Sequence, residues 1–520
     1  MSSSASYAPR LLPLRLPRVC VAVVGRTPAE MLERAEGVVR DNPFVEFRLD
    51  YLRQPSAGFA RIKRFLDYHP EVLAIATCRR ARNGGKFQGS VASEIDLLIR
   101  AAAAGCQLLD LELESVLKLK PKDVERLRTH AALILSFHDF RGTRKLDETF
   151  KKMQAVPADF YKLVSTANRL YDNVVMMKFL EQKSEKHSMV GVCMGEPGII
   201  SRVLGVRAGS VFTFGAATAG EETAVGQIAG YTLRNTYRID QVDAATKVYC
   251  VAGDPVAHSL SPLLMNTAFR RENVNAVYLT LHAKTMDDLL ACVRDIPIHG
   301  ISVTMPYKEE ILKHLDNTDP VSSKIGACNT VIRGQDGNLY GFNTDVAGVI
   351  RPLEQRLVIA NAKVLVLGAG GAARAAVFGL KERQAEVYIM NRTAGAGKRL
   401  AKQARAKFIG RSMLKKLTFD VIINATPVGM KGGAGRLPLK DREINARVVM
   451  DMVYTPAETR FLRTARARGI QVIPGWEMLL HQAARQFEIW TGKPAPVDEM
   501  QRILMAALEQ QTAAAGKKKK

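Results

Sequence analysis

The 520-residue sequence predicts an α/β protein in two halves: a (β/α)8 TIM barrel, then a unit that contains a Rossmann-type nucleotide-binding domain. In residues 18–240, short apolar runs alternate with amphipathic stretches, as in parallel α/β folds. In residues 363–380, KVLVLGAGGAARAAVFGL, an apolar strand pattern leads into a glycine-rich turn and then a helix pattern. Hydrophobic residues make up 47% and charged residues 24% of the chain, the proportions of an ordinary globular protein.

The first half contains eight strand patterns: RVCVAVVG, PFVEFRLD, EVLAIATC, QLLDLEL, AALILSF, DFYKLVS, SMVGVCMG and SVFTFG. Helix patterns such as PAEMLERAEGVVR and VASEIDLLIRAAAAG separate them. Eight strand–helix units in about 230 residues match a (β/α)8 barrel in count and size. A doubly wound sheet is the alternative, but it rarely needs eight strands of such even spacing.

The formal net charge of +24 is compatible with nucleic acid or with anionic small molecules as partners. The basic residues, however, are spread along the whole chain, and no stripe of Arg and Lys interleaved with aromatic residues occurs. We therefore predict small-molecule carboxylate substrates and no nucleic acid. No apolar run reaches the eighteen or so residues of a membrane span, so we predict no membrane association.

The seven cysteines are scattered, without a CxxC pair or a Cys/His cluster at zinc spacing, so we predict no metal site. Most of them lie in apolar strand patterns, as reduced core residues of an intracellular protein do. Residues 1–17 contain Ser and Arg but no acid, as transit peptides do. Because this segment is short and interrupted by prolines, we predict a disordered leader on a cytoplasmic protein, with organelle targeting as the alternative. The run GKKKK predicts a solvated basic tail over residues 512–520.

A lysine stands where the sixth strand pattern requires an apolar residue, in DFYKLVSTA. Lysine is almost never fully buried unless it is paired or functional. Catalytic residues of a (β/α)8 barrel lie at the carboxyl ends of its strands, and charged or titratable residues occur there: Glu46, Arg48, Arg79, His138, Lys162 and Arg202. One such residue is usually a strand end or a satisfied core residue, but six that converge on one face indicate a binding site.

These residue types suit imine chemistry on a ketone that carries a carboxylate. A desolvated lysine beside other cations has a lowered pKa and becomes a nucleophilic amine. The imine it forms is an electron sink for the neighbouring carbon, while a histidine moves the protons. Arginines would hold a carboxylate through paired hydrogen bonds. We therefore predict that Lys162 is a Schiff-base lysine and that His138 is its acid–base partner.

The segments EFRLD, SFHDF, FYKLVSTA, SRVLG and GQI together resemble type I 3-dehydroquinate dehydratase, over nearly all of residues 18–238. The resemblance implies that Lys162 forms an imine with 3-dehydroquinate and that His138 eliminates water as the general acid–base. It assigns substrate binding to Glu46, Arg48, Arg79, Arg202, Thr223 and Gln227. Asn83 stands where the family usually has Glu, which removes a carboxylate, and Thr223 stands where it usually has Ser, which keeps a hydroxyl.

The second half contains six further motifs: AHSLSP (257–262), SVTMPYK (302–308), GACNT (326–330), GFNTDVAG (341–348), NATPVGM (424–430) and GWEMLLHQ (475–482). Lys308 and Asp345 are a candidate ion pair able to relay a proton to or from a carbinol oxygen. Hydroxyl and amide side chains suited to a polyhydroxylated ring accompany them: Ser259, Ser261, Thr304 and Asn329. Taken singly, each could equally be a cap or turn residue.

Together these motifs resemble shikimate dehydrogenase over residues 247–510. The resemblance implies a substrate-binding domain over 247–348, completed by helices near 480–511, and a Rossmann NADP-binding domain over 349–479. It places Lys308 and Asp345 beside the reacting hydroxyl and adds two substrate contacts, Tyr454 and Gln482. Ser302 stands where the family often has Asn.

The residues after the second Rossmann strand indicate the cofactor. An NAD site has Asp or Glu there, to bind the ribose 2′-hydroxyl. In this chain Arg392 would attract a 2′-phosphate, whereas a carboxylate would repel it. We therefore predict NADP (NADPH), held by Gly368, Ala369, Gly370, Gly371, Ala372, Asn391, Arg392, Thr393, Met452 and Gly475. The second basic residue that the family often has three positions after the Thr is replaced by Ala396, with Lys398 two positions further on.

The two halves fit consecutive reactions of the shikimate pathway. Dehydration of 3-dehydroquinate gives 3-dehydroshikimate, which NADPH reduces to shikimate. We therefore predict a bifunctional lyase and oxidoreductase. One alternative is an aldolase-like barrel fused to a quinate dehydrogenase, but relatives that prefer quinate tend to have a smaller residue at the position of Ser261. The other is a non-catalytic regulator, which would be expected to lack one of Lys162, His138, Lys308 and Asp345.

Overall fold

The computed structural model describes residues 12–13, 15–256, 259–430 and 435–517. It forms two compact units, Met1–Thr246 with Leu281–Ile296, and Lys247–Thr280 with Pro297–Lys520. The first unit includes Leu281–Ile296, a grouping that was not predicted. Residues 1–11 and 14 of the predicted leader and residues 518–520 of the predicted tail lie outside the described residues.

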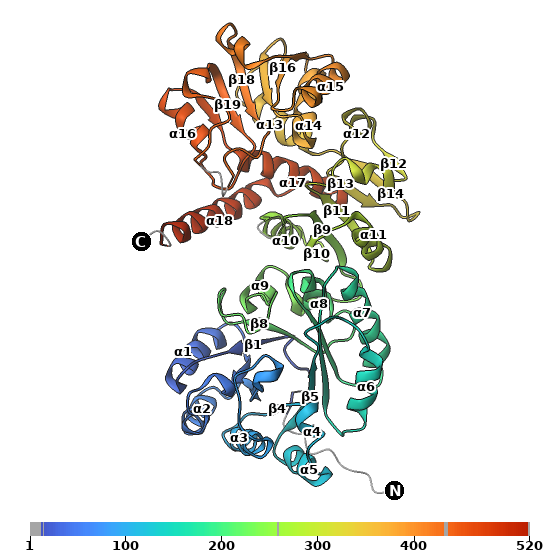
Figure 1. The fold of residues 1–520 in the computed structure, drawn as a ribbon, viewed down its shortest axis with the longest axis vertical. Helices are drawn as coiled ribbons and strands as arrows, with labels where there is room; N and C mark the ends of the chain where they lie inside the picture. Colours follow the sequence, from blue (N-terminus) through green and yellow to red (C-terminus); the bar gives the residue numbers. More distant parts are fainter. Residues whose placement is uncertain (1–11, 14, 257–258, 431–434, 518–520) are drawn as a thin grey trace. The chain divides into compact units, whose positions relative to one another are not determined.

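The first unit contains an eight-stranded parallel sheet in the order β7-β6-β5-β4-β3-β2-β1-β8 (Figure 1). Pairing of β1 with β8 curls the sheet, and an isolated bridge between Met189 and Ser210 connects its two ends. This nearly closed barrel confirms the predicted fold and all eight predicted strands: β1 (Val19–Val23), β2 (Phe44–Arg48), β3 (Leu73–Thr77), β4 (Leu108–Glu112), β5 (Ala132–His138), β6 (Phe160–Thr166), β7 (Met189–Met194) and β8 (Thr213–Ala216).

Amphipathic helices connect the barrel strands and cover the outside of the sheet (Figure 1). Side-chain caps begin α1 and α3: Thr27 accepts a hydrogen bond from Glu30 N at the start of α1, and Ser90 accepts one from Ser93 N at the start of α3. The helices are α1 (Pro28–Val39), α2 (Phe59–Tyr68), α3 (Val91–Ala103), α4 (Leu113–Val116), α5 (Pro121–His130), α6 (Leu146–Gln154), α7 (Tyr171–Ser184), α8 (Ile199–Leu204) and α9 (Gly230–Asn235). Helix α11 (Met286–Asp295) packs on α7 within the same unit.

The second unit begins with a six-stranded mixed sheet in the order β10-β9-β11-β13-β14-β12. Its strands are β9 (Lys247–Gly253), β10 (Ala276–His282), β11 (Ile298–Val303), β12 (Asn317–Thr318), β13 (Thr330–Arg333) and β14 (Leu339–Phe342). Its helices are α10 (Ser261–Arg271), α12 (Pro320–Ile325) and α13 (Asp345–Glu354). One apolar core joins β9 and α10 to the two C-terminal helices, α17 (Gly475–Thr491) and α18 (Val497–Lys517). Helix α18 continues to Lys517, beyond the predicted start of the tail at residue 512.

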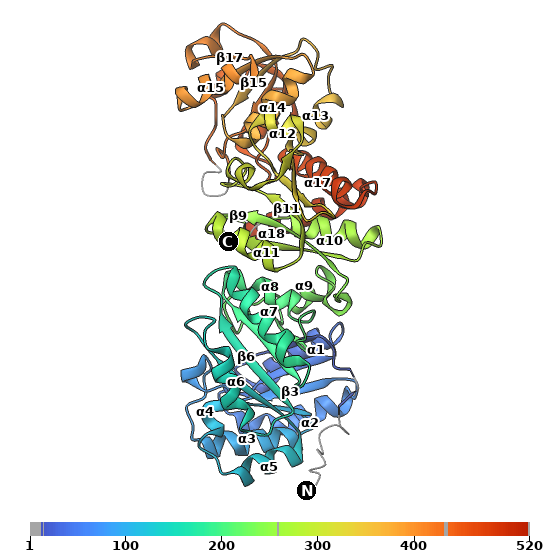
Figure 2. The same ribbon diagram turned by 90° about the vertical axis from the view of Figure 1, so that its right-hand side faces the viewer.

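The Rossmann part contains a six-stranded parallel sheet in the order β17-β16-β15-β18-β19-β20. This is the doubly wound order, in which ligands bind at the carboxyl edge where the strand order reverses, here between β15 and β18. The strands are β15 (Lys363–Leu367), β16 (Glu386–Met390), β17 (Lys407–Phe408), β18 (Phe419–Asn424), β19 (Ala446–Asp451) and β20 (Gln471–Ile473). Three helices accompany them, α14 (Gly371–Glu382), α15 (Ala394–Ala404) and α16 (Arg460–Ala467); Figure 2 shows α14 and α15 beside this sheet. No helix among the described residues is both long and apolar enough to cross a membrane.

Candidate active sites

The barrel interior changes from apolar to charged along the strands, because inward-facing residues recur at every second position. Near the amino ends the interior is an apolar cluster that includes Phe44, Leu108, Ile134 and Phe160. Two residues further along each strand stand Glu46, Asp110, Ser136 and Lys162, all buried. Two residues further again, on β2, β4 and β5, stand Arg48, Glu112 and His138. The lysine that interrupts an apolar strand pattern therefore belongs to the middle layer of the barrel interior.

The amine of Lys162 is buried and lies against carboxylates. Its Nζ donates a hydrogen bond to Asp110 Oδ2 at 2.8 Å and lies 3.9 Å from Glu46 Oε1. Its Nζ also lies 3.9 Å from the centroid of the Phe214 ring. We predicted a desolvated lysine beside other cations: the desolvation is present, but the nearest charged groups are carboxylates. Both acids come from other strands of the barrel, Asp110 from β4 and Glu46 from β2, and lie at the same depth of the interior as Lys162 on β6.

Asp110, which sequence reasoning missed, connects the lysine to a buried network. Its Oδ1 accepts hydrogen bonds from Arg79 Nη2 at 2.9 Å and from Ser136 Oγ at 2.6 Å. Burial alone would raise the pKa of this carboxyl, but the positive charges of Arg79 and Lys162 lower it well below its usual range. Asp110 therefore stays ionised and anchors the amine, and it is a poor acceptor for a proton.

The three predicted arginines of the barrel differ in how they are paired. Arg48 forms two hydrogen bonds to Asp50, both at 2.9 Å. Arg79 is bound to Asp110 and also lies 3.3 Å from Glu112. Arg202 is buried as well, yet within the described residues it has no carboxylate partner and its Nε makes no hydrogen bond.

The unpaired charge of Arg202 indicates an anionic ligand. Its burial without a counter-ion lowers its pKa to about 10. An unpaired charge inside a protein is costly, and a charged ligand that supplies the missing partner removes that cost. Of the three arginines, Arg202 is therefore the one available to a substrate carboxylate.

The loop after β8 places the two remaining predicted barrel contacts near Arg202. Gln227 Oε1 accepts hydrogen bonds from Thr223 N at 2.7 Å and from Thr223 Oγ1 at 3.1 Å. The carbonyl oxygen of Val225, between them, accepts from Arg202 Nη2 at 3.4 Å. Gly226 has a positive φ of 76°, and a Cβ on it would lie 2.1 Å from the carbonyl oxygen of Gly195, so this loop can approach the β7–α8 connection only with glycine here.

His138 ends β5 and presents a ring nitrogen without a partner. Its Nδ1 is buried and makes no hydrogen bond to any described residue, while the side chain as a whole is half-buried. Burial, followed by the positive charges of Arg79 and Lys162, lowers the pKa of His138 well below its ordinary value. The imidazole is therefore neutral at pH 7 and can accept a proton. Asn83, where the family pattern has an acid, donates instead to Glu114 at 3.3 Å.

In the second unit, the predicted ion pair of Lys308 and Asp345 is present. Lys308 follows β11, and Asp345 is the first residue of α13. Asn329 Nδ2 donates to Asp345 Oδ1 at 2.7 Å and to Thr344 Oγ1 at 3.0 Å. Thr344 N in turn donates to Asn329 Oδ1 at 2.7 Å. The aspartate is thus fixed by the amide that the sequence assigned to the substrate ring.

An amide group from another residue contacts Ser302, at the position where the family often has Asn. Gln486 of α17 donates through Nε2 to Ser302 Oγ at 3.0 Å, to Thr330 Oγ1 at 3.1 Å and to the carbonyl oxygen of Asn329 at 3.3 Å. The glutamine thus supplies, from another element, the kind of group that the local motif lacks. Sequence reasoning missed it because the two positions are 184 residues apart.

The other predicted substrate contacts come from four separate elements. Ser261 begins α10, and its N–H donates to Ser259 Oγ at 3.2 Å. Thr304 follows β11, Tyr454 follows β19, and Gln482 lies one turn before Gln486 on α17. Among the residues that the structure describes, none of these side chains forms a hydrogen bond or an ion pair with Lys308, so their common role stays a prediction.

The glycine-rich turn between β15 and α14 fits a dinucleotide. Gly368 has a φ of 119°, and a Cβ on Gly370 would meet no atom within 4 Å, so the backbone is open to a pyrophosphate. Helix α14 begins here without an acid in its first turn, so its N-terminus attracts phosphate. A Cβ on Gly371 would lie 3.2 Å from Cδ of Lys308. The turn and the proposed relay lysine are therefore in contact.

The residues after β16 fit the phosphate of NADP. Arg392 is exposed and forms no ion pair with any residue that the structure describes. Asn391 Nδ2 donates to the carbonyl oxygen of Thr393 at 2.9 Å and so holds this short connection in shape. The guanidinium is therefore free to bind a 2′-phosphate.

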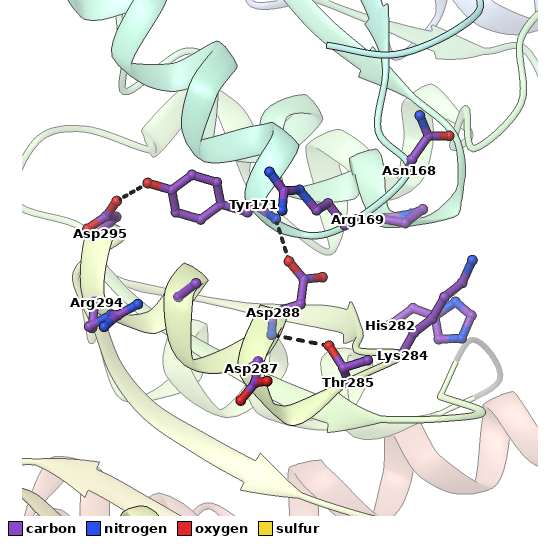
Figure 3. Close-up of a pocket in the computed structure, with 12 residues that line it drawn as sticks. Asn168, Arg169, Tyr171, His282, Lys284, Thr285, Asp287, Asp288, Arg294 and Asp295 are labelled. Carbon is purple, nitrogen blue, oxygen red and sulfur yellow. Dashed lines mark hydrogen bonds between the residues drawn. The ribbon is translucent and has the colours of Figure 1, made fainter. Parts of the chain in front are cut away.

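A separate cavity of about 680 Å³ lies in the first unit, between the start of α7 and α11 (Figure 3). Asp288 accepts hydrogen bonds from Leu170 N at 2.7 Å and from Tyr171 N at 3.1 Å, and Tyr171 Oη donates to Asp295 at 2.6 Å. These contacts hold α11 against α7. None of the residues that we predicted to be catalytic lines this cavity.

The fold and the two sites define a class of protein, a lysine–imine barrel joined to a dinucleotide-dependent dehydrogenase. Comparison with family models agrees: type I 3-dehydroquinase matches residues 19–244, and the shikimate dehydrogenase substrate binding domain matches 251–331. Shikimate / quinate 5-dehydrogenase matches residues 353–429, and the shikimate 5′-dehydrogenase C-terminal domain matches 475–505.

A relative from Arabidopsis thaliana, the chloroplastic bifunctional 3-dehydroquinate dehydratase/shikimate dehydrogenase, is 33% identical over 87% of this chain and 78% of its own. Shikimate dehydrogenase (NADP(+)) of Pyrococcus furiosus is 38% identical over 52% of this chain and 99% of its own. A structure of the Thermus thermophilus shikimate 5-dehydrogenase with NADP(H) and shikimate is 33% identical over 50% of this chain and all of that one, with a TM-score of 0.48. The chain belongs to the family of bifunctional 3-dehydroquinate dehydratase/shikimate dehydrogenases.

Proposed function

We propose that the chain catalyses two consecutive steps of the shikimate pathway. The first unit dehydrates 3-dehydroquinate to 3-dehydroshikimate, and the second reduces that product to shikimate with NADPH. The observation that carries this proposal is a buried lysine amine in a barrel that also buries an arginine without a counter-ion. A ketone that carries a carboxylate satisfies both groups.

The dehydration follows from the layered interior of the barrel. Lys162 Nζ, after losing a proton, adds to the ketone carbon, and loss of water gives an imine. His138 removes the proton from the neighbouring carbon, the electron pair moves into the imine, and the hydroxyl on the next carbon leaves with the proton that His138 returns. Hydrolysis of the imine releases the product and restores the amine.

The charges assign the proton transfers within the barrel. The pKa of Asp110 is too low for it to be the base, and the imidazole of His138 is neutral. His138 is therefore the group that both accepts and returns the proton. Arg202 binds the substrate carboxylate, and Arg79 holds Asp110 in place rather than the substrate.

In the second unit, bound NADPH supplies a hydride to the ketone of 3-dehydroshikimate. Lys308 donates a proton to the carbonyl oxygen as it becomes a hydroxyl, and Asp345 orients the amine. Asn329 fixes Asp345 through a hydrogen bond from its Nδ2. The glycine turn at Gly368–Gly371 and Arg392 would hold the pyrophosphate and the 2′-phosphate.

The compartment that we propose is the cytoplasm. The seven cysteines are all free and buried, as in a reducing compartment. Organelle targeting is the alternative, and the chloroplastic description of the Arabidopsis relative makes it worth testing by imaging the tagged full chain.

The test is incubation of the full chain with 3-dehydroquinate and NADPH. NADPH absorbance should fall, and shikimate should be the product identified. A fall with added 3-dehydroshikimate but none with 3-dehydroquinate would contradict the role of the barrel. NADP reduction with quinate in place of shikimate would identify the second unit as a quinate dehydrogenase.

A further inference from the structure

Asp451, the last residue of β19, is a fully buried carboxylate that the reactions above do not use. No cation pairs with it in the part of the chain that the structure describes, and its burial raises its pKa to about 6. A buried carboxylate without a cation costs free energy. A neutral side chain would fill the same space at a lower cost in free energy, which indicates that the carboxylate has a role at this position.

Hydrogen bonds from three different segments converge on Asp451. Its Oδ1 accepts from Asn424 Nδ2 at 2.9 Å and from Val453 N at 3.1 Å. Its Oδ2 accepts from Thr459 Oγ1 at 2.6 Å, and Thr459 also caps α16 by accepting from Leu462 N at 3.3 Å. One side chain thus joins the end of β18, the backbone after β19 and the start of α16.

Two of these segments reach the proposed dinucleotide site. Asn424 lies beside Asp451 in the sheet and beside Leu367, the residue before the glycine turn. A Cβ on Gly368 would lie 2.9 Å from the carbonyl oxygen of Ala425, so the turn rests on the backbone that follows Asn424. The Asn424 amide therefore transmits the position of Asp451 to the turn that faces the pyrophosphate.

The other contact is with the segment that carries two predicted ligand-binding residues. Val453, whose N–H Asp451 holds, lies between Met452, predicted to touch the cofactor, and Tyr454, predicted to touch the substrate. A Cβ on Gly475 would lie 2.5 Å from the carbonyl oxygen of Val453 and 2.8 Å from that of Asp451. The segment is therefore held between the carboxylate on one side and the start of α17 on the other.

We propose that Asp451 is a positioning residue of the dehydrogenase: it fixes residues 424–430 and 452–454 in the arrangement that the dinucleotide and the substrate ring require. The position of these segments matters because a displacement of a binding or catalytic group by about 1 Å can lower the rate about a hundredfold. The inference rests on the proposed function, since it needs a dinucleotide at this edge.

A matched control lies at the opposite end of the same sheet. Asp420 on β18 accepts a hydrogen bond from Lys363 N at 2.9 Å and so ties two strands together at their amino ends. It contacts none of the predicted ligand-binding residues. Asp420→Ala therefore removes a carboxylate that joins strands of this domain without touching the dinucleotide edge.

The experiment compares five full-length variants: Asp451→Ala, Asp451→Asn, Thr459→Val, Thr459→Ser and Asp420→Ala. The dissociation constant for NADPH is measured by its fluorescence, the Michaelis constant for shikimate by NADP reduction, and folding by thermal denaturation. Asp451→Ala and Thr459→Val should raise both the dissociation constant for NADPH and the Michaelis constant for shikimate roughly tenfold or more. Thr459→Ser keeps the hydroxyl and should restore values near wild type, and Asp420→Ala should change stability only.

Wild-type constants in both Asp451→Asn and Thr459→Val would overturn the proposal. So would an equal loss of NADPH affinity in Asp420→Ala, because it would show a general loss of stability. If Asp451→Ala does not fold, the comparison of Thr459→Val with Thr459→Ser decides. If the wild-type chain binds NADPH but does not reduce 3-dehydroshikimate, the proposed reaction fails while the NADPH measurement still tests Asp451.

Discussion

Both halves of the chain place a lysine against an aspartate, but they do so in different surroundings. Lys162 projects from a strand, its side chain is 5% exposed, and its partner Asp110 is itself held by an arginine and a serine. Lys308 lies in a loop, its side chain is 17% exposed, and its partner begins a helix. An amine that attacks a ketone benefits from desolvation and rigid placement, whereas an amine that relays a proton needs access to the reacting oxygen. The same pair of residue types therefore serves two chemistries.

The largest expected effect is on Lys162, because its amine forms the covalent bond to the substrate in the proposed reaction. Lys162→Ala should abolish dehydration and leave shikimate oxidation intact, since the two sites belong to separate units. Borohydride added with 3-dehydroquinate should trap a covalent adduct on Lys162 of the wild type, which mass spectrometry can locate. An adduct on a different lysine, or none, would refute the imine.

The second lysine should show a smaller loss, because it transfers a proton and forms no bond to carbon. Lys308→Ala should reduce shikimate turnover about a hundred- to ten-thousandfold and barely change NADP affinity. Since Asp345 acts by orienting Lys308, the double variant with Asp345→Ala should be little worse than the poorer single variant. Losses that multiply would show that the two residues act independently. Dehydratase activity serves as the control and should stay near wild type.

The arginines of the barrel sharpen the contrast between paired and unpaired charge. Arg202→Gln should raise the Michaelis constant for 3-dehydroquinate roughly tenfold to a hundredfold, because a hydrogen bond to a charged group contributes about 1.5–3 kcal/mol. It should not lower the melting temperature, because it removes a buried charge that has no partner. Arg79→Gln should lower the melting temperature, because Asp110 loses one of its two cationic partners and Glu112 loses the guanidinium that lies 3.3 Å from it. If Arg202→Gln lowered the melting temperature and Arg79→Gln did not, Arg79 would be the better candidate for the substrate carboxylate and Arg202 would be the structural residue.

The smallest expected effect is at the exposed Arg392. Arg392→Asp should weaken NADP binding about tenfold to a hundredfold and NAD binding much less, by placing a carboxylate against the 2′-phosphate. Screening by solvent and salt should keep this loss near the lower end of that range, below the loss expected for the buried groups. Michaelis constants for both cofactors measure it, and an unchanged value for NADP would remove Arg392 from the cofactor site.

The barrel could be predicted in detail because its signals are local. Each strand is a short apolar run, and Lys162 was found because it breaks one of them. Asp110 escaped the same reasoning because QLLDLEL has charged residues near its end, where a strand normally meets solvent. Lys162 follows the inward-facing Phe160 by two positions. The same interval after Leu108 gives Asp110, so this rule would have identified it.

Pairings between distant residues could not be predicted from the sequence. The pairing of Arg79 with Asp110, for example, depends on which side chains share a layer in the folded barrel. Gln486 and Ser302 likewise meet only because α17 returns to the first sheet of the second unit. The grouping of Leu281–Ile296 with the barrel depends on contacts such as Asp288 with the start of α7, which no local pattern indicates.

The layered interior of the barrel also limits the access of reagents to the amine of Lys162. Lys162 lies one layer deeper in the barrel interior than Arg48, Glu112 and His138, and its side chain is only 5% exposed. Reagents that modify amines should consume the many exposed lysines of this basic chain before they reach this one. The amine that we propose to form the imine is thereby shielded from reagents in the solvent.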